Sequence, residues 1–271
     1  MKNKSSNEKV TIYLSLFFIL FLVIIILLYI FGIIGNNEAS VDIVLNREHM
    51  ITYKKEKWEK VLSKDYEKYN WNKFGVYEEG QKKGTYSLYT PDGDFYLFEV
   101  KNNSRTPIET PENSLYLGGQ KDSKFIEFGR EELSDSDKEY VKSILRKNNI
   151  SETDLDNYIL GYKIIQDFDN DDKKEIMYIV SNMFSMNVND TAYSFIFVKD
   201  GEKNNIIYKK ILDAPNRFSG CYAYLLGLVK IDGNDYTQII TSCKSYSVSN
   251  NNEYGIYRNR NNNYELLLYI K

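Results

Sequence analysis

The sequence predicts an α+β protein made of one N-terminal transmembrane helix and an extracytoplasmic, mainly antiparallel β domain. Three observations predict this class. Residues 10–34 carry no charged side chain. Tyr and Phe are abundant, with 24 and 14 residues, and they occur in short runs that favour strands. The C-terminal part contains a weak internal repeat of strand-like segments, and the length permits one large domain or two small ones.

The apolar run from Val10 to Ile34 is long enough to cross a bilayer. At about 1.5 Å per residue it extends roughly 37 Å, against a hydrocarbon core of about 30 Å. Three lysines lie within residues 1–9, whereas the first basic residue after the run is Arg47. This asymmetry predicts a cytoplasmic N-terminus and an exported C-terminal part. We therefore expect a single-pass protein of the cell membrane with an uncleaved anchor.

Two other interpretations of the run stay open. A cleaved signal peptide also begins with basic residues, but its apolar core is usually about 7 to 15 residues long, and residues 35–40 form a poor cleavage site. An internal buried helix is the third interpretation. The anchor interpretation divides the chain into five predicted segments: a cytoplasmic tail (1–9), the transmembrane helix (10–34), a spacer (35–50), an α+β region (51–150) and a β-rich region with two repeats (151–271).

Net charge argues against nucleic acid as a partner. The chain carries −3 at pH 7, and the exported part, without the net +2 of the tail, is near −5. Nucleic-acid binding needs a basic face that neutralises phosphates. A composition rich in Tyr, Ile, Asn and Lys with four prolines is typical of an AT-rich bacterial genome.

Helical spacing and turn residues place the first elements of the exported part. Apolar residues recur at helical spacing between about 51 and 69, which predicts a packing helix with charged residues on its other face. Two β-rich runs, 85–90 and 95–100, flank Pro91–Asp94. A turn with Pro and Gly between such runs predicts a hairpin.

Further strands and a second helix follow. Residues 115–129 supply one or two strands around a polar stretch. Residues 134–148 have one apolar face and end at paired asparagines, and Ser134 or Asp135 can cap the N-terminus. We expect two or three packing helices in the whole exported part.

The internal repeat predicts two similar β units. Ile165–Ile176 aligns with Leu228–Ile239, and residues 193–197 align with 254–258 at nearly the same offset. Each unit is predicted to form four strands: a hairpin around a polar turn and then a second hairpin. Four-stranded units in tandem are typical of propeller blades, but two blades cannot close a ring. We expect a propeller-like pair of sheets or one continuous curved sheet.

An acidic turn in the first unit indicates a calcium site. Asp167, Asp169 and Asp171 alternate along the chain and Glu175 follows, so that their carboxylates can converge on one point. Ca²⁺ prefers such oxygen ligands, and a backbone carbonyl near Lys173 can add one more. We expect an ion here to stabilise the turn rather than to catalyse a reaction.

These residues resemble the Asp-x-Asp/Asn-x-Asp-Gly-x-x-Asp/Glu calcium loops of FG-GAP or VCBS-type repeats. The resemblance covers residues 165–176 and, weakly, 228–239; it implies a calcium-binding loop at the start of a propeller-type repeat. It departs at Asp172, where the family has glycine and the backbone is often left-handed, a conformation that Asp tolerates better than most residues.

The second copy has Lys230, Asp232, Asn234 and Gln238 at the ligand positions, and we expect it to hold no calcium. Both copies also fit plain hairpin turns, in which Asp, Asn and Gly occur for backbone reasons alone.

The two cysteines are predicted to form a disulfide. Cys221 and Cys243 are centred on the predicted turn at residues 231–235, so that folding of the hairpin brings them to neighbouring strands. An exported location favours the bond. Two buried free thiols, or a nucleophilic Cys221, are the alternatives.

Most catalytic motifs are missing. The sole histidine, His49, lies before the first predicted helix, far from either cysteine in sequence. Zinc-protease, nucleophile-elbow and phosphate-loop motifs do not occur. Carboxylate-only chemistry needs two acids about 5 to 10 Å apart and stays open. Six acids offer pairs, although solvated loops and helix ends explain them better: Glu131, Glu132, Asp135, Glu152, Asp154 and Asp156.

Together these features predict a non-catalytic, membrane-tethered binding or adaptor protein of the bacterial cell envelope. Its expected partners are the lipid bilayer, through residues 10–34, and an envelope protein or a cell-wall polymer. Two alternatives come from other classes: a carboxylate-dependent envelope hydrolase, and a single-pass subunit of a secretion or conjugation complex.

Overall fold

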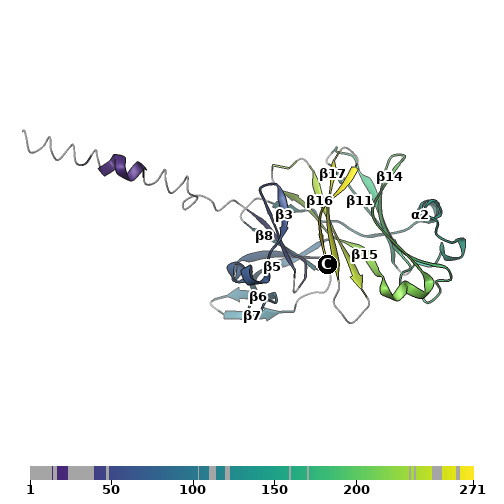
Figure 1. Cartoon of the computed structure of the whole chain (residues 1–271), viewed down its shortest axis with the longest axis horizontal. Coiled ribbons are helices and arrows are strands. Elements are labelled where there is room, and N and C mark those ends of the chain that lie inside the picture. The colour runs from purple at the N-terminus through teal and green to yellow at the C-terminus, as the bar shows by residue number, and fades with distance from the viewer. Residues whose placement is uncertain are drawn as a thin grey trace, which may run out of the picture. The chain divides into compact units, whose positions relative to one another are not determined.

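Antiparallel sheets build the domain from Ser40 onward in the computed structural model of the chain (Figure 1). The structure describes residue 14 and residues 17–23, 40–46, 49–102, 104–109, 114–119, 123–158, 160–169, 171–231, 233–234, 236–245, 252–260 and 263–271.

The first sheet has eight strands in the order β3-β2-β1-β8-β4-β5-β6-β7. All neighbours pair antiparallel, which permits short connections. The strands are β1 (Val41–Val44), β2 (Met50–Lys54), β3 (Lys57–Lys60), β4 (Lys73–Glu78), β5 (Gln81–Tyr89), β6 (Tyr96–Lys101), β7 (Ser104–Ile108) and β8 (Ser114–Gly119).

Each sequence repeat supplies four consecutive strands to a sheet of its own, and one earlier strand joins each sheet at an edge. The second sheet contains β10 (Glu131–Glu132), β11 (Leu160–Gln166), β12 (Glu175–Ser181), β13 (Thr191–Asp200) and β14 (Lys203–Asp213). The third sheet contains β18 (Asn263–Ile270), β17 (Glu253–Arg260), β16 (Thr237–Ser245), β15 (Cys221–Ile231) and β9 (Ser123–Phe125).

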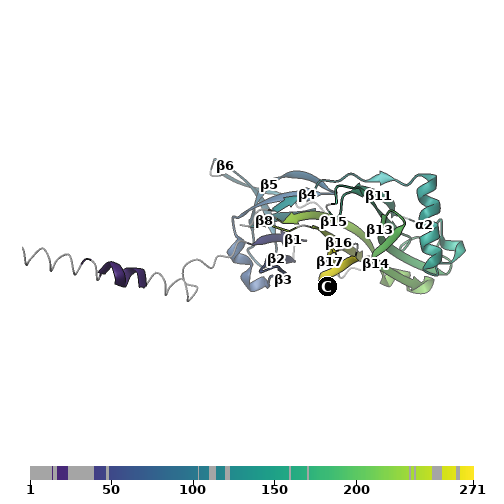
Figure 2. The ribbon, with the colours of Figure 1, turned by 90° about the horizontal axis from the view of Figure 1, so that it is seen from above.

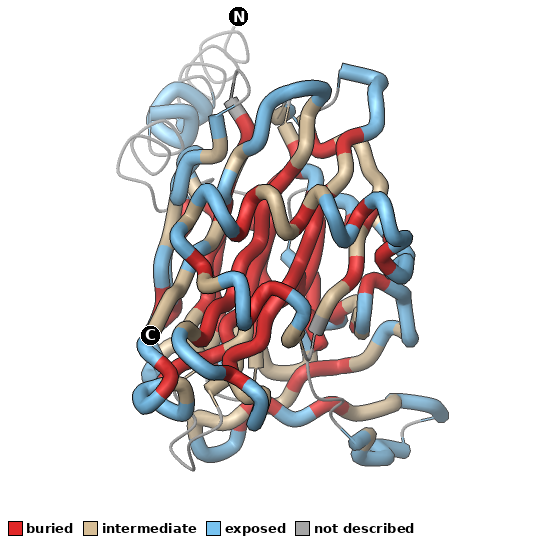
Figure 3. The backbone as a smooth tube through the Cα atoms, turned by 90° about the vertical axis from the view of Figure 1, so that its right-hand side faces the viewer, coloured by how far each residue is buried: buried red, intermediate tan, exposed pale blue. Residues whose placement is uncertain are grey.

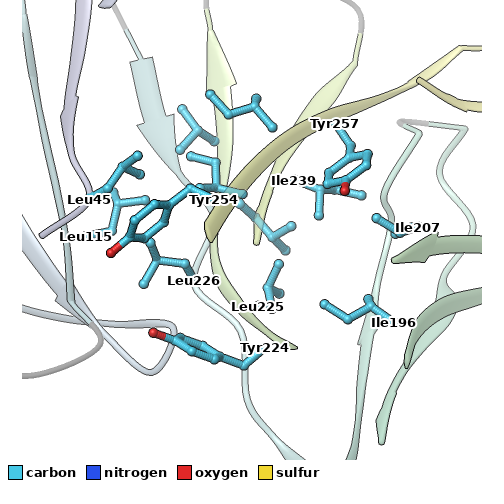
Figure 4. Packing of buried hydrophobic residues seen from close by; sticks show 14 of the residues in the cluster. Leu45, Leu115, Ile196, Ile207, Tyr224, Leu225, Leu226, Ile239, Tyr254 and Tyr257 are labelled. Carbon is cyan, nitrogen blue, oxygen red and sulfur yellow. The ribbon is translucent and has the colours of Figure 1, made fainter. Parts of the chain in front are cut away.

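The third sheet packs between the other two. One buried cluster joins residues of all three sheets, and Figure 4 shows Leu115 of the first sheet, Leu225 and Ile239 of the third, and Ile196 and Ile207 of the second. Burial therefore runs along the central strands, while turns and edges are exposed (Figure 3). Burial of so much apolar surface is the main driving force for this assembly.

Helix α2 (Asp135–Lys147) covers the outer face of the second sheet (Figure 2). Val141 and Leu145 of the helix join a cluster with Tyr178 and Phe195 of the sheet. Because the opposite face of β12 and β13 packs on the third sheet, both faces are buried, which explains their nearly continuous apolar sequence. Three short 3-10 helices complete the described elements: η1 (Ser63–Tyr69), η2 (Glu152–Asp154) and η3 (Ala214–Ser219).

Several sequence predictions are confirmed. The helix over 134–148 is α2, and Ser134 caps it in a capping box with Asp137. The hairpin around Pro91–Asp94 forms from β5 and β6, which pair through Ser87 and Phe98. Residues 115–129 contain β8 and β9.

The helix expected between 51 and 69 is wrong. This stretch forms most of β2, all of β3 and then η1. Lys55 and Glu56 both have positive φ, of 48° and 62°, and make a tight two-residue hairpin turn. Tyr53 and Trp58 therefore face each other across the hairpin, 5.2 Å apart between ring centroids. The segment expected to be a spacer, 35–50, also contains β1, which is fully buried.

The predicted α+β class with a transmembrane helix is contradicted. The described domain is mostly antiparallel β-sheet with one α-helix on its surface, and its two four-strand units pack face to face rather than as propeller blades. Among the described residues, no helix is long and apolar enough to cross a membrane. Leu14 and Phe17–Val23 are described as helical; the rest of the predicted span 10–34, and the tail 1–9, lie outside the described residues. The lack of such a helix among the described residues contradicts the predicted single-pass location in the cell membrane. The predicted contact of residues 10–34 with the lipid bilayer stays a prediction.

Candidate metal centre

The β11–β12 hairpin gathers the acidic residues singled out in the sequence. Gln166 and Glu175 pair at the end of the two strands, and the described residues between them, 167–169 and 171–174, belong to the turn. One carboxylate oxygen from each of four residues lies within 4.8 Å of the others: Asp167, Asp169, Asp171 and Glu175. The side chain of Lys173 instead donates to Asp171 Oδ2 at 2.9 Å. The turn thus presents four converging carboxylates with one ammonium at its rim.

Local hydrogen bonds shape the turn. The N–H groups of Asp171 and Lys173 donate to the carboxylates two residues earlier, Asp169 and Asp171, at 3.2 and 2.9 Å. Asp172 N–H donates to Asp167 Oδ2 at 3.1 Å. Asp172 has a φ of +65°, so the left-handed backbone expected at this position is confirmed. The backbone itself turns the acidic side chains toward one another.

Glu175 is the buried member of the group, with 4% of its surface exposed. It accepts a hydrogen bond from Phe168 N–H at 2.7 Å. Burial, and then the neighbouring aspartates, raise the pKa of Glu175 to about 7 in spite of that bond. Lys173, which is mostly exposed, pairs with the exposed Asp171 rather than with Glu175. A cation bound to Glu175 would stabilise the ionised form of this side chain.

Tyr264 of the third sheet lies near this turn, because the carboxylates of the turn act on its phenol. Asn259 of β17 and Tyr264 of β18 are a cross-strand pair. Burial raises the pKa of the Tyr264 phenol, and the nearby carboxylates of Glu175 and Asp169 raise it further. The side chain of Asn259 acts on the phenol in the opposite direction, through a hydrogen bond that lowers the pKa of Tyr264. Sequence analysis missed Tyr264, because an approach between separate sheets leaves no local pattern.

Three of the other acids weighed in the sequence make structural contacts. Glu152 pairs with Arg146 at 2.7 Å and Asp156 pairs with Lys142 at 2.8 Å, all on or beside α2. Asp154 is fully buried and accepts hydrogen bonds from three backbone N–H groups. Asp154 ends η2, as the interpretation by helix ends allows, but it is not solvated.

An aromatic group on the first sheet also uses its rings for packing within the domain. Trp71 stacks on Tyr89 with 4.9 Å between centroids, and Phe98 lies 5.8 Å away. The Arg105 guanidinium lies 3.8 Å from the centroid of the Trp71 ring. These rings therefore pack on one another and on Arg105 within the domain.

The predicted disulfide between Cys221 and Cys243 is present, with a Cα–Cα distance of 5.3 Å. The bond runs diagonally across β15 and β16, because Cys221 pairs with Ser245 and Cys243 pairs with Ala223. Tyr208 of β14 approaches Cys243 Sγ at 2.9 Å. Glu253 lies near both sulfurs, but sulfurs joined to each other are not thiolate ligands for a metal.

We expect reduction of this disulfide to lower the free energy of unfolding by about 3 kcal/mol, because the open chain gains conformational entropy. Urea denaturation with and without reductant measures the difference. A Cys221→Ala, Cys243→Ala double variant is the control and should not respond to reductant. Two free thiols in the denatured, unreduced protein would contradict the bond.

No protein-family model, curated protein or solved structure matches this chain.

Proposed function

We propose that this protein is a non-catalytic binding protein whose β-sandwich is stabilised by a Ca²⁺ ion in the acidic turn. The observation that carries the proposal is the convergence of four carboxylates within 4.8 Å of one another, with the buried Glu175 among them. Ca²⁺ is bound by six to eight oxygens, and carboxylates are its preferred protein ligands. The ligand set proposed is Asp167, Asp169, Asp171 and Glu175, with a backbone carbonyl near Lys173.

The spacing of the acids supports an ion rather than a hydrolase. Glycoside hydrolases hold their two carboxyl groups about 5 to 10 Å apart, with the sugar between them. The oxygens here lie within 4.8 Å of one another in a tight turn, a separation that suits one cation. The hydrolase alternative and the predicted envelope partner stay predictions.

We expect calcium titrated into the full chain to bind with a single-site isotherm, and Asp169→Asn to weaken binding at least about tenfold, or about 1.4 kcal/mol. Asp169 is a half-buried member of the converging group. Isothermal titration calorimetry measures both proteins. Saturating calcium should also raise the unfolding midpoint of the native protein.

Asp172→Asn is the matched control, because it removes the same negative charge from the turn as Asp169→Asn does. Asp172 lies in the same turn but outside the converging group, and Asn tolerates its left-handed backbone. Its affinity should stay close to that of the native protein. Absence of heat in the native protein, or equal losses in both variants, would rule out the proposed site.

A further inference from the structure

Strands β5, β6 and β7 lie at the end of the first sheet away from β3 (Figure 1). The buried cluster that joins the three sheets includes residues of β1, β2, β3 and β8, but none of the described residues of β5–β7. Leu88 of β5 and Leu97 of β6 instead pack in a separate cluster with Tyr66 of η1. One face of β5–β7 is therefore covered within the domain, whereas the buried cluster between the sheets does not reach the opposite face.

The strand register places aromatic side chains on this opposite face. Tyr89 and Tyr96 form the cross-strand pair next to the pair that packs with η1, and neighbouring pairs point to opposite faces of a sheet. Phe98 and Val100 follow Tyr96 at alternate positions and share its face. Tyr96 is 42% exposed and Val100 is 49% exposed. Apolar side chains gathered in one exposed patch indicate a binding surface.

The charged side chains on this face are basic. Arg105 of β7 pairs with Val100 and therefore shares its face; it is exposed and has no carboxylate partner among the described residues. Lys73 of β4 lies on the same face by its register with β5. The one acid in the sequence of β5–β7 is Glu99, which points to the other face and pairs there with Lys101 at 2.6 Å. In a chain of net charge −3, this face therefore attracts anions.

Trp71 supports the face from a strained backbone. Its φ of +68° is an outlier for a bulky side chain. Hydrogen bonds hold it there: Trp71 N–H donates to Leu88 O at 2.6 Å, and the N–H and hydroxyl of Thr90 donate to Asn70 Oδ1 at 2.7 and 2.8 Å. The ring is thereby fixed against the guanidinium of Arg105. Backbone strain that the surroundings maintain in this way is typical of binding sites.

We propose that this face of β5–β7 binds an acidic polysaccharide, a chain of sugar rings that carries carboxylate groups. The Arg105 guanidinium donates two parallel hydrogen bonds to one carboxylate, and the Trp71 ring fixes the plane of the guanidinium. The C–H groups of a neighbouring sugar ring stack on the exposed Tyr96 ring, whose face is electron-rich. The inference rests on the binding role proposed above and adds a site and a ligand class to it, but it does not involve the calcium site.

Charge argues against a second copy of the chain as the occupant. A two-fold contact through this face would bring Arg105 and Lys73 of one copy against the same basic residues of the other. Like charges placed close together destabilise such a contact. An acidic glycan neutralises these charges and also uses the aromatic rings.

The test titrates oligogalacturonate into the full chain in the presence of EDTA, with isothermal titration calorimetry as the measurement. Methyl-esterified oligogalacturonate keeps the sugar rings and removes the charges, whereas polyglutamate keeps the charges and lacks the rings. We expect oligogalacturonate to bind at least about tenfold more tightly than either comparison ligand, because it alone satisfies both Arg105 and Tyr96.

Two variants and two matched controls locate the site. Arg105→Gln and Tyr96→Ala should each weaken binding about tenfold, and both side chains are exposed, so that the fold should be kept. Lys101→Gln removes the same charge from the same hairpin but on the other face. Tyr269→Ala removes a tyrosine of similar exposure, 49%, from β18. Both controls should bind oligogalacturonate as the native protein does.

Tryptophan fluorescence gives a second readout. Trp58 and Trp71 are the two tryptophans, and Trp58 is 6% exposed in the cluster between the sheets. Bound oligogalacturonate should protect the native protein from quenching by acrylamide, because it covers Trp71. In Trp71→Phe the remaining signal from Trp58 should not change when the ligand is added.

The outcomes separate this proposal from the calcium site. Absence of oligogalacturonate binding, equal binding of either comparison ligand, or equal losses in the variants and their controls would overturn the acidic-glycan site. A stable dimer that Arg105→Gln or Tyr96→Ala disrupts would also overturn it, because a second copy would then cover the face. Because EDTA removes calcium, binding of oligogalacturonate under these conditions supports the glycan site even if calcium titration gives no heat.

Discussion

Replacing Asp154 with alanine should lower the free energy of unfolding by about 5 kcal/mol, the largest effect expected of any single change in this protein. The carboxylate is completely buried and receives backbone N–H groups from Asn189, Asp190 and Thr191 at 2.7 to 2.9 Å. Alanine leaves three donors unpaired at the start of β13, and each such donor costs about 1 to 3 kcal/mol. Urea denaturation of both proteins gives the difference.

Two variants show whether the backbone contacts account for the loss. Asp154→Asn keeps one oxygen for the Asp190 and Thr191 N–H groups but turns an amide toward Asn189, so its loss should be intermediate. Asp156→Ala removes an exposed acid that pairs with Lys142, and exposed pairs contribute about 1 kcal/mol or less. If Asp154→Ala were no worse than Asp156→Ala, the three backbone hydrogen bonds would not be important for stability.

The features that were predictable from sequence have local causes. Helix α2 followed from its capping serine and its apolar face, and the acidic hairpin and the disulfide followed from turn residues and a symmetric spacing. Each of these signals lies within a few residues, or within one hairpin. Physical interactions inside such a segment decide its conformation largely without the rest of the chain.

The errors have a common cause in tertiary structure. Between residues 51 and 69 the spacing of apolar residues suited a helix, but strand pairing with β1 and the turn at Lys55–Glu56 produced a hairpin instead. The burial of Asp154 was not predicted, because nothing near it in sequence indicates residues 189–191, whose N–H groups it binds. The approach of Tyr264 to the carboxylates of the acidic turn is likewise invisible until the sheets are assembled.

Asp137→Asn should lower the free energy of unfolding by about 4 kcal/mol at pH 7, because it breaks a mostly buried ion pair. Asp137 accepts hydrogen bonds from Lys163 Nζ and from the Tyr178 hydroxyl, both at 2.8 Å, and from Ser134 of the capping box. It therefore connects the first turn of α2 to the second sheet. Burial alone would raise the pKa of Asp137, but these hydrogen bonds outweigh it and hold the pKa well below the ordinary range.

The lowered pKa of Asp137 predicts how this effect depends on pH. A carboxylate whose pKa is lower in the folded state contributes its full stability above the unfolded value of about 3.9, and the contribution falls as the pH drops below that value. The difference between the native protein and Asp137→Asn should therefore be constant from pH 7 to about pH 5 and about 1 kcal/mol smaller at pH 3. Glu131, an exposed acid 4.0 Å from Lys163, provides the control through Glu131→Gln, which should cost less than about 1 kcal/mol. If the difference in the free energy of unfolding between the native protein and Asp137→Asn grew at low pH, Asp137 would be protonated in the folded protein. The apolar face of α2 would then be the only contact that holds the helix to the sheet.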